Sequence, residues 1–181
     1  MPRLFFGLEI PPEIKDRLLE ITTAVSGAKW QSAEQLHITL LFLGSVEEER
    51  FAAICDSASG ILTDPFHLQV IGLGCFGRPQ NPRNLWAGVQ PAVPVAGLHR
   101  ALQGQMETLG FATEKRAFRP HITLARFKHK ADSVEAVLAE QGERDFGQFP
   151  VTEFALFESK PGPAGSAYTI IERFPLRTPT A

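Results

Sequence analysis

Apolar residues recur along the chain at two spacings, and these spacings predict a mixture of strands and helices. Short runs rich in Phe, Leu, Ile and Val are typical of β-strands. Apolar residues three and four positions apart indicate helices that bury one face. Strands are expected over residues 3–9, 29–31, 36–43, 66–73, 85–89, 118–127, 149–159 and 167–176. Helices are expected from Pro12 until Gly27, over 47–62, after Pro94 until Gly110, and over 132–141.

Two stretches between these elements read as loops. Residues 74–84 are rich in Gly, Pro, Arg and Asn, and residues 160–165 are rich in Gly and Pro, which interrupt regular structure. Several expected strands follow one another directly, so a layered α+β domain is favoured over a regular βαβ alternation. We expect one domain over residues 1–181, because this length supports one core.

A tetrapeptide is repeated within two of the expected strands. His37-Ile38-Thr39-Leu40 returns as His121-Ile122-Thr123-Leu124, 84 positions later. Strand side chains alternate between faces, so each copy places an imidazole beside a hydroxyl on one face. The repeat suggests an internal duplication, with two lobes related by a pseudo-two-fold axis and a cleft between them.

Two imidazoles across a cleft can act together, one accepting a proton from a nucleophile while the other donates one to a leaving group. The hydroxyls of Thr39 and Thr123 would donate hydrogen bonds to a tetrahedral anion such as phosphate. The pattern does not favour a metal centre, because each strand supplies one His, and Thr is a poor zinc ligand. We expect no metal and no cofactor. His67, His99 and His129 are interpreted as structural or surface residues.

Charge and composition limit the kinds of partner and compartment that can be expected for this protein. The net charge of −2 excludes a global basic field, so any contact with nucleic acid must be local. Cys55 and Cys75 do not form a metal or redox motif and are expected to be reduced. The first residues lack a signal-peptide segment, and no run approaches a membrane span. We therefore expect a cytoplasmic protein with no membrane contact, and a monomer.

The paired motifs resemble those of the two-histidine (2H) phosphoesterase superfamily, and specifically the RNA 2′,3′-cyclic phosphodiesterase family, also named 2′-5′ RNA ligases. Further matching pieces are weak singly: Arg3-Leu4-Phe5-Phe6 with Pro11, Phe42-Leu43-Gly44, Leu85-Trp86, Arg119-Pro120 before the second motif, Ala125-Arg126 after it, Ser159, Tyr168 and Pro175-Leu176. Together these pieces cover nearly the whole chain.

The resemblance implies a bilobal α+β fold with two antiparallel sheets, flanking helices and an active-site cleft between the lobes. It implies metal-independent hydrolysis of an RNA or nucleoside 2′,3′-cyclic phosphate to a 2′-phosphate, and joining of tRNA halves through a 2′-5′ bond. By this similarity His37 corresponds to the proton donor and His121 to the proton acceptor. The residues alone leave that assignment open, because both motifs read the same.

Four further side chains are candidates for substrate binding. Arg126 suits phosphate oxygens, although strict alternation places it on the face opposite His121; Arg116 and Arg119 approach the same strand. Trp86 or Phe42 could stack a base, but alternation turns Phe42 away from His37 and favours a core position. The substrates expected are RNA ends or cyclic nucleotides. A non-catalytic nucleotide or RNA-end binding module on the same fold is the alternative.

Overall fold

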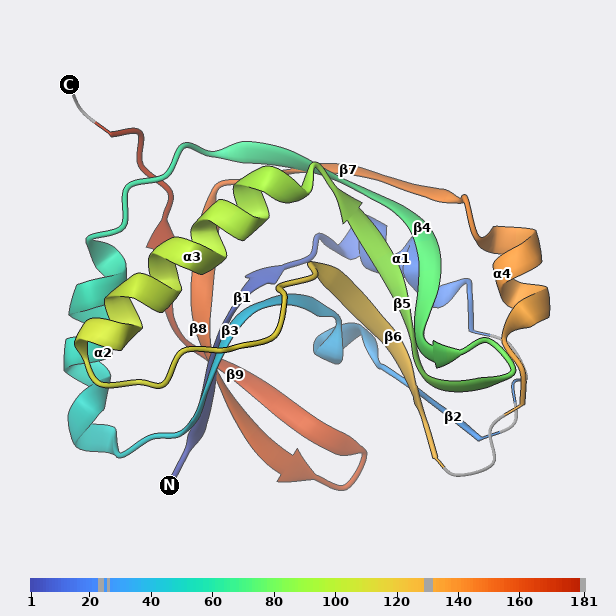
Figure 1. The fold of residues 1–181 in the computed structure, drawn as a ribbon, viewed down its shortest axis with the longest axis horizontal. Coiled ribbons are helices and arrows are strands. Elements are labelled where there is room, and N and C mark those ends of the chain that lie inside the picture. The colour runs from blue at the N-terminus through green and yellow to red at the C-terminus, as the bar shows by residue number, and fades with distance from the viewer. Residues whose placement is uncertain (23–24, 26, 129–131, 180–181) are drawn as a thin grey trace.

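The computed structural model describes residues 1–22, 25, 27–128 and 132–179, and in these residues one curved antiparallel sheet carries four α-helices (Figure 1). The strands are β1 Arg3–Glu9, β2 Ala28–Trp30, β3 His37–Ser45, β4 Phe66–Arg78, β5 Asn81–Gln90, β6 His121–Phe127, β7 Asp145–Val151, β8 Glu153–Gly162 and β9 Gly165–Pro175. The helices are α1 Pro12–Leu19, α2 Phe51–Ser59, α3 Ala92–Thr108 and α4 Glu135–Gln141, with 3₁₀ turns at Ala33–Gln35 and Glu48–Arg50.

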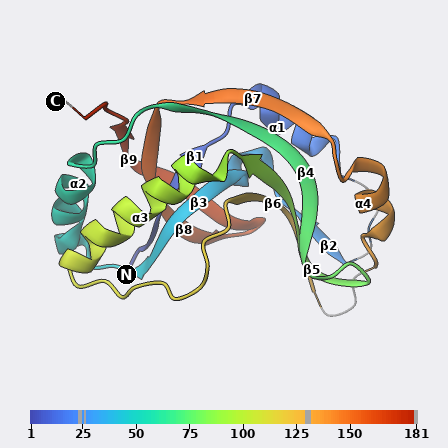
Figure 2. The same ribbon diagram turned by 45° about the horizontal axis from the view of Figure 1, so that its top comes forward.

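The strand order divides the sheet into two lobes. The order is β7-β4-β5-β6-β3-β1-β8-β9, with β2 added beside β6. We call β3, β1, β8 and β9 the first lobe and β6, β5, β4 and β7 the second lobe. The two predicted antiparallel sheets correspond to these lobes, and a single residue pair, Ile38 opposite Ile122, joins them into one sheet. Figure 2 shows the strong curvature of that sheet, clearest along β4 and β7.

Each lobe repeats the same order of elements around its motif strand. Along the chain, β1, α1, β3 and α2 form the first copy of this order, with β2 inserted before β3, and β5, α3, β6 and α4 form the second copy. The motif strands β3 and β6 lie next to each other at the centre, while β9 and β7 form the two ends. The α+β class and the pseudo-two-fold arrangement predicted from the repeat are therefore confirmed.

The amphipathic patterns account for the packing of the helices. The apolar side chains of α3 are buried, including Val95, Leu98 and Leu102, and this helix packs against β3. Ile14 and Leu18 of α1 are buried where the helix contacts β7. A single large cluster of buried residues, drawn from strands and helices of both lobes, forms the main core.

Several predicted boundaries were wrong, for identifiable reasons. Residues 74–84 form the end of β4 and the start of β5, because pairing between the strands overrides their Gly- and Pro-rich composition. The predicted strand 149–159 is two strands that separate at Thr152: β7 forms one end of the sheet, and β8 lies in the other lobe between β1 and β9. The loop predicted at 160–165 is also mostly strand, since β8 continues to Gly162 and β9 begins at Gly165.

The first predicted helix is shorter than expected. It ends at Leu19, although Ile21 remains buried, and residues 23, 24 and 26 of the expected helix lie outside the described residues. The strand expected from residue 118 begins only at His121, so residues 111–120 approach the motif without regular structure. Within the described part of the chain, no helix has the length and apolar character needed to cross a membrane.

Candidate active site

The four motif side chains lie on one face of the sheet at the junction of the lobes. Ile38 and Ile122 pair across β3 and β6 and are both fully buried, so they point into the core. Their neighbours along each strand must therefore point to the other face. Continued by one residue to either side, this antiparallel register directs His37 towards Thr123 and Thr39 towards His121.

Both imidazoles are anchored in the same way. Nδ1 of His37 lies 2.7 Å from the carbonyl oxygen of Gln35, and Nδ1 of His121 lies 2.6 Å from that of Arg119. A carbonyl oxygen only accepts, so each Nδ1 must donate its hydrogen. In the neutral rings Nε2 then carries a lone pair. The hydroxyl of Thr39 lies 2.8 Å from Nε2 of His37, and each ring is thus oriented for proton transfer at Nε2.

A bulge in each motif strand changes which side chains share that face. Leu40 has no partner in β1, because Thr39 pairs with Gly7 and Leu41 with Phe6. One unpaired residue in a strand shifts the alternation by one position. Phe42 therefore returns to the face of His37 and Thr39. The prediction that Phe42 occupies the core is wrong, because 68% of its surface is exposed.

The second motif has the matching bulge. Leu124 has no partner in β5, because Thr123 pairs with Trp86 and Ala125 with Leu85. The shift brings Arg126 onto the face of His121 and Thr123, contrary to the prediction from strict alternation. Arg126 and Phe42 occupy the same position in the two copies of the motif, five residues after the histidine. The site therefore has a cation at one end and an exposed aromatic ring at the other.

A cavity of about 520 Å³, here called the motif cavity, opens at the aromatic end of the site. It is lined by Thr39 and Phe42 of the first lobe and by Phe76 and His121 of the second. His37 lines a smaller cavity of about 110 Å³, together with Lys15 and Tyr168. The hydrogen bond between His37 and Thr39 connects the side chains that line the two cavities.

The remaining predicted binding residues are placed differently from one another. Arg116 and Arg119 both line the motif cavity from the segment before β6; both are exposed, and Arg116 lies 3.8 Å from the carboxylate of Glu114. Trp86 does not line that cavity. Its ring covers Gly74, where an added Cβ would lie 2.4 Å from the indole, and its centroid is 6.1 Å from that of His121. Trp86 thus forms part of the wall beside His121.

His99 bridges the two motifs from α3. Its Nδ1 donates to the carbonyl oxygen of Leu40, the bulged residue, over 2.6 Å, and its ring stacks on Phe118 at 4.2 Å. Phe118 precedes His121 by three residues. His99 is buried, as expected of a structural residue, and it also lines the motif cavity. Residue spacing carries no signal for this contact, because α3 and β3 meet only in the fold. His67 is exposed, and His129 lies outside the described residues.

Aromatic rings surround His37 more completely than His121. Phe5 lies 4.9 Å and Tyr168 lies 5.1 Å from the His37 ring, between centroids. Burial lowers the pKa of His37 to about 4, and the cationic Arg126 acts in the same direction. Burial and Arg126 also lower the pKa of His121. Arg126 therefore lies close enough to influence both imidazoles, and both are neutral at pH 7 without a bound anion.

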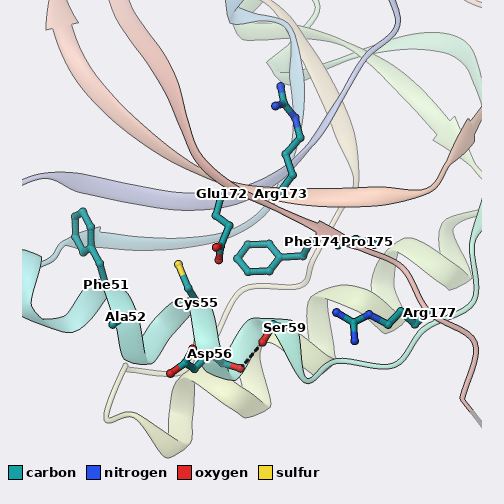
Figure 3. Close-up of a pocket in the computed structure, with 10 residues that line it drawn as sticks. All are labelled: Phe51, Ala52, Cys55, Asp56, Ser59, Glu172, Arg173, Phe174, Pro175 and Arg177. Atoms are coloured by element: carbon teal, nitrogen blue, oxygen red, sulfur yellow. Dashed lines mark hydrogen bonds between the residues drawn. The ribbon is translucent and has the colours of Figure 1, made fainter.

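A second large cavity lies away from the motifs. It has a volume of about 540 Å³ and lies between α2 and β9, where Figure 3 shows Cys55, Glu172 and Arg177, and it contains no motif residue. Burial raises the pKa of Cys55 to about 12, so this thiol is not a nucleophile at neutral pH. Within the described residues, no three His, Cys, Asp or Glu side chains gather as a metal site.

Comparison with known proteins gives a consistent group of relatives. The family model described as LigT like Phosphoesterase matches residues 8–86 and 89–168, and each match contains one motif. A protein of Archaeoglobus fulgidus named RNA 2′,3′-cyclic phosphodiesterase is 33% identical over 175 residues, which are 95% of this chain and 99% of the relative. A Thermus thermophilus protein of the same name is 36% identical over 187 residues, covering 97% of this chain and 90% of the relative.

Solved structures agree with the sequence relatives. The crystal structure of E. coli LigT complexed with 3′-AMP has a TM-score of 0.81 and 31% identity, and the match covers 97% of this chain and 99% of that one. A crystal structure of a Thermus thermophilus protein has a TM-score of 0.83 at 31% identity, covering 97% of this chain and 98% of that one.

The depressed pKa of His37 predicts a specific acid sensitivity. Between its ordinary pKa near 6.5 and the folded value of about 4, the unfolded chain binds a proton that the folded chain does not. Stability is therefore lost as the pH falls through this window. From pH 7 to pH 5 His37 should account for up to about 2 kcal/mol of lost unfolding free energy. Urea denaturation at both pH values measures the loss.

The matched variants are His37→Gln, which removes the titrating group, and His67→Gln, which removes an exposed histidine. The first should lose distinctly less stability than the wild type over this pH interval, and the second should lose the same amount. Equal losses in all three proteins would contradict the assignment.

Proposed function

The chain belongs to the family of LigT-like phosphoesterases, and from this premise we propose that it hydrolyses the 2′,3′-cyclic phosphate of RNA ends or nucleotides to a 2′-phosphomonoester. The observation that carries the proposal is the placement of both motif imidazoles on one face, beside a cavity large enough for a nucleoside. The relatives named RNA 2′,3′-cyclic phosphodiesterase support the same substrate class. Residues 1–181 act as one bilobal unit.

The reaction requires a base, an acid and stabilisation of charge on phosphorus. Nε2 of His121 accepts a proton from water as the water oxygen attacks phosphorus. The bond between phosphorus and the 3′ oxygen breaks, and Nε2 of His37 donates a proton to that oxygen. The electrons of the broken bond remain on the 3′ oxygen, which becomes the 3′-hydroxyl. Each proton transfer contributes about 10² to 10⁴ in rate.

Three side chains bind the phosphoryl oxygens in this scheme. The hydroxyls of Thr39 and Thr123 donate hydrogen bonds, and the guanidinium of Arg126 supplies positive charge. No metal or cofactor takes part in the scheme. A reacting phosphate also places its anion beside His37, which favours the protonated ring and offsets the effect of burial. Binding of substrate therefore favours protonation of His37, whose imidazole is neutral in the free protein at pH 7.

We assign His37 as the acid and His121 as the base because the surroundings of the two rings differ. His37 packs against Phe5 and Tyr168, whereas His121 contacts Phe76 and also lines the motif cavity, which is open to solvent. In the motif cavity Phe42 stacks the base, and Arg116 and Arg119 at its rim contact the sugar-phosphate chain. Trp86 supports the ring of His121. If a 5′-hydroxyl takes the place of water as the nucleophile, the same groups join RNA ends, such as tRNA halves, through a 2′-5′ bond, and the 3′ oxygen again leaves as the 3′-hydroxyl. The reverse of this joining step cleaves the 2′-5′ bond.

Both imidazoles come from one chain, so a monomer is sufficient for this chemistry. Cytoplasmic residence and the monomeric state stay predictions, to be tested by fractionation of cells and by sedimentation.

Removal of either imidazole should greatly reduce turnover without unfolding the protein. In His37→Ala and His121→Ala, hydrolysis of 2′,3′-cyclic nucleotides in EDTA should fall by about 10² to 10⁴. Phosphorus NMR should identify the wild-type product as the 2′-phosphate. Circular dichroism provides the control for folding. Undiminished turnover in either variant would remove the scheme, and binding of nucleotides without any product in the wild type would favour the binding-module alternative.

The pH dependence should be bell-shaped and differ between kcat/KM and kcat. The pKa of His37 is about 4 and that of His121 is lowered in the free protein, so kcat/KM should be maximal below pH 6.5. The maximum of kcat should lie at higher pH, because the bound phosphate raises the pKa of His37. In Arg126→Gln the kcat/KM maximum should move to higher pH. A kcat/KM that rises steadily through pH 9 would contradict the paired-imidazole scheme.

The exposed ring of Phe42 should act in binding more than in the chemical step. A base stacked on an aromatic side chain contributes about 1–3 kcal/mol. In Phe42→Ala the KM for cyclic nucleotides should therefore rise by roughly five- to a hundredfold, with kcat nearly unchanged. Steady-state kinetics measures both constants. A fall in kcat at constant KM would show that Phe42 positions the motif instead.

A further inference from the structure

Lys29 extends the charged end of the site onto β2. In the antiparallel pair of β2 and β6, Lys29 lies directly opposite Arg126. Residues opposite each other in such a pair share a face of the sheet. The bulge at Leu124 places Arg126 on the face of His121 and Thr123, and Lys29 therefore lies on that face too. Both Lys29 and Arg126 are exposed.

This pair of like charges is not neutralised by the protein. Like charges directly opposite each other in a sheet are destabilising. Among the ion pairs of the described residues, none involves Lys29 or Arg126. By contrast, Arg173 and Arg144 each pair with a glutamate. An anion bound between Lys29 and Arg126 would remove the repulsion.

The ammonium of Lys29 reaches across to the first lobe. Gly165 forms the last pair of the β8–β9 hairpin with Gly162, and Figure 1 shows this hairpin. A Cβ added to Gly165 would lie 3.0 Å from Nζ of Lys29 and 3.2 Å from Nε2 of Gln35. Gln35 donates to the carbonyl oxygen of Ser166 over 2.8 Å, and its own carbonyl oxygen anchors His37. Lys29 thus stands beside the residue that orients the acid.

The basic pair and the motif cavity lie at opposite ends of the site. From the junction of Ile38 and Ile122, Phe42 lies further along β3 and Arg126 further along β6. The two strands are antiparallel, so these directions are opposite. The motif cavity contains Phe42 but neither Arg126 nor Lys29. A nucleotide whose base occupies the motif cavity therefore leaves Lys29 available for another group of the substrate.

We propose that Lys29, beside Arg126, binds a second phosphate group of the substrate while Arg126 keeps its contact with the reacting phosphate, and that the enzyme therefore prefers strands over cyclic mononucleotides. The inference rests on the proposed function. The phosphate has two possible sources: the phosphodiester on the 5′ side of the terminal nucleotide, or a phosphate of a nucleotide attached beyond the reacting phosphate by a 2′-5′ bond. A 2′,3′-cyclic mononucleotide without a 5′-phosphate has neither, so Lys29 discriminates without acting on the reacting bond.

The test uses two pairs of substrates whose members differ by one phosphate. Adenosine 2′,3′-cyclic phosphate is compared with its 5′-phosphorylated form. 2′-5′-linked adenylyl-adenosine is compared with the same compound carrying a 3′-phosphate on the adenosine beyond the reacting phosphate. In Lys29→Gln, kcat/KM should fall on the order of tenfold for one phosphorylated member, because a hydrogen bond to a charged group is lost. Its unphosphorylated partner should be unaffected, and the affected pair identifies the source. Lys29→Arg should keep most of the preference.

Salt dependence and a matched variant complete the design. On the affected substrate, the slope of log kcat/KM against log salt should decrease by about 0.7 in Lys29→Gln, as for one lost phosphate contact. Arg100→Gln removes an exposed charge from α3 and should change neither pair of substrates. Calorimetry measures the same preference without turnover. Adenosine 2′-phosphate is compared with its 5′-phosphorylated form, and the two 2′-5′-linked compounds are titrated into His121→Ala, which should not cleave them.

The outcomes separate the two proposals. If wild-type protein turns over no cyclic phosphate, the proposed function fails, and calorimetry alone decides whether Lys29 binds the second phosphate. If turnover is normal but Lys29→Gln affects both members of a pair equally, or neither member of either pair, the second phosphate site is overturned while the proposed function stands. Loss of the preference in Arg100→Gln would also overturn it, because general surface charge would then be the cause.

Discussion

The site depends on one contact, the pairing of Ile38 with Ile122 where the two lobes meet. This is the only residue pair by which β3 and β6 join within the described residues, and both side chains are buried in the core. Burial of two isoleucines fixes which face each strand turns inward. Because residues on either side of each isoleucine must then face outward, two histidines and two threonines converge without any further constraint. The curved sheet, the helices and the core serve to hold this junction.

The two copies of the motif provide the same side chains, and the two lobes differ in the residues that surround them. Both histidines are anchored through Nδ1 to a carbonyl two residues earlier, and both strands are bulged one residue after the threonine. The position that follows each bulge holds Phe42 in one lobe and Arg126 in the other. Three aromatic rings surround the first imidazole, whereas the second contacts two aromatic rings and lines the open motif cavity. In the proposed scheme, one fold thereby provides an acid and a base from identical motifs.

The sequence predicted the positions of side chains correctly where the alternation along a strand is regular, and wrongly where a bulge interrupts that alternation. The repeat of His and Thr at spacing two predicted the shared face and the two lobes, because both follow from strand geometry alone. The faces of Phe42 and Arg126 were predicted wrongly, since a bulge depends on the partner strand and leaves no mark in the strand's own residues. The β4–β5 hairpin was missed for a similar reason: its Gly and Pro residues resemble a loop until the partner strand is known. The contact of His99 with Leu40 joins residues 59 positions apart and could not be predicted from local pattern.

The most direct test of this account is nitrogen-15 NMR of the histidine side chains during titration with a nucleoside 2′-phosphate. In the free protein at pH 7, His37 and His121 should both show the Nδ1–H tautomer. On binding, the Nε2 resonances of both rings should shift together at the same ligand concentration, because both contact one phosphate. A response from only one of the two imidazoles, or Nε2–H tautomers in the free protein, would contradict the account.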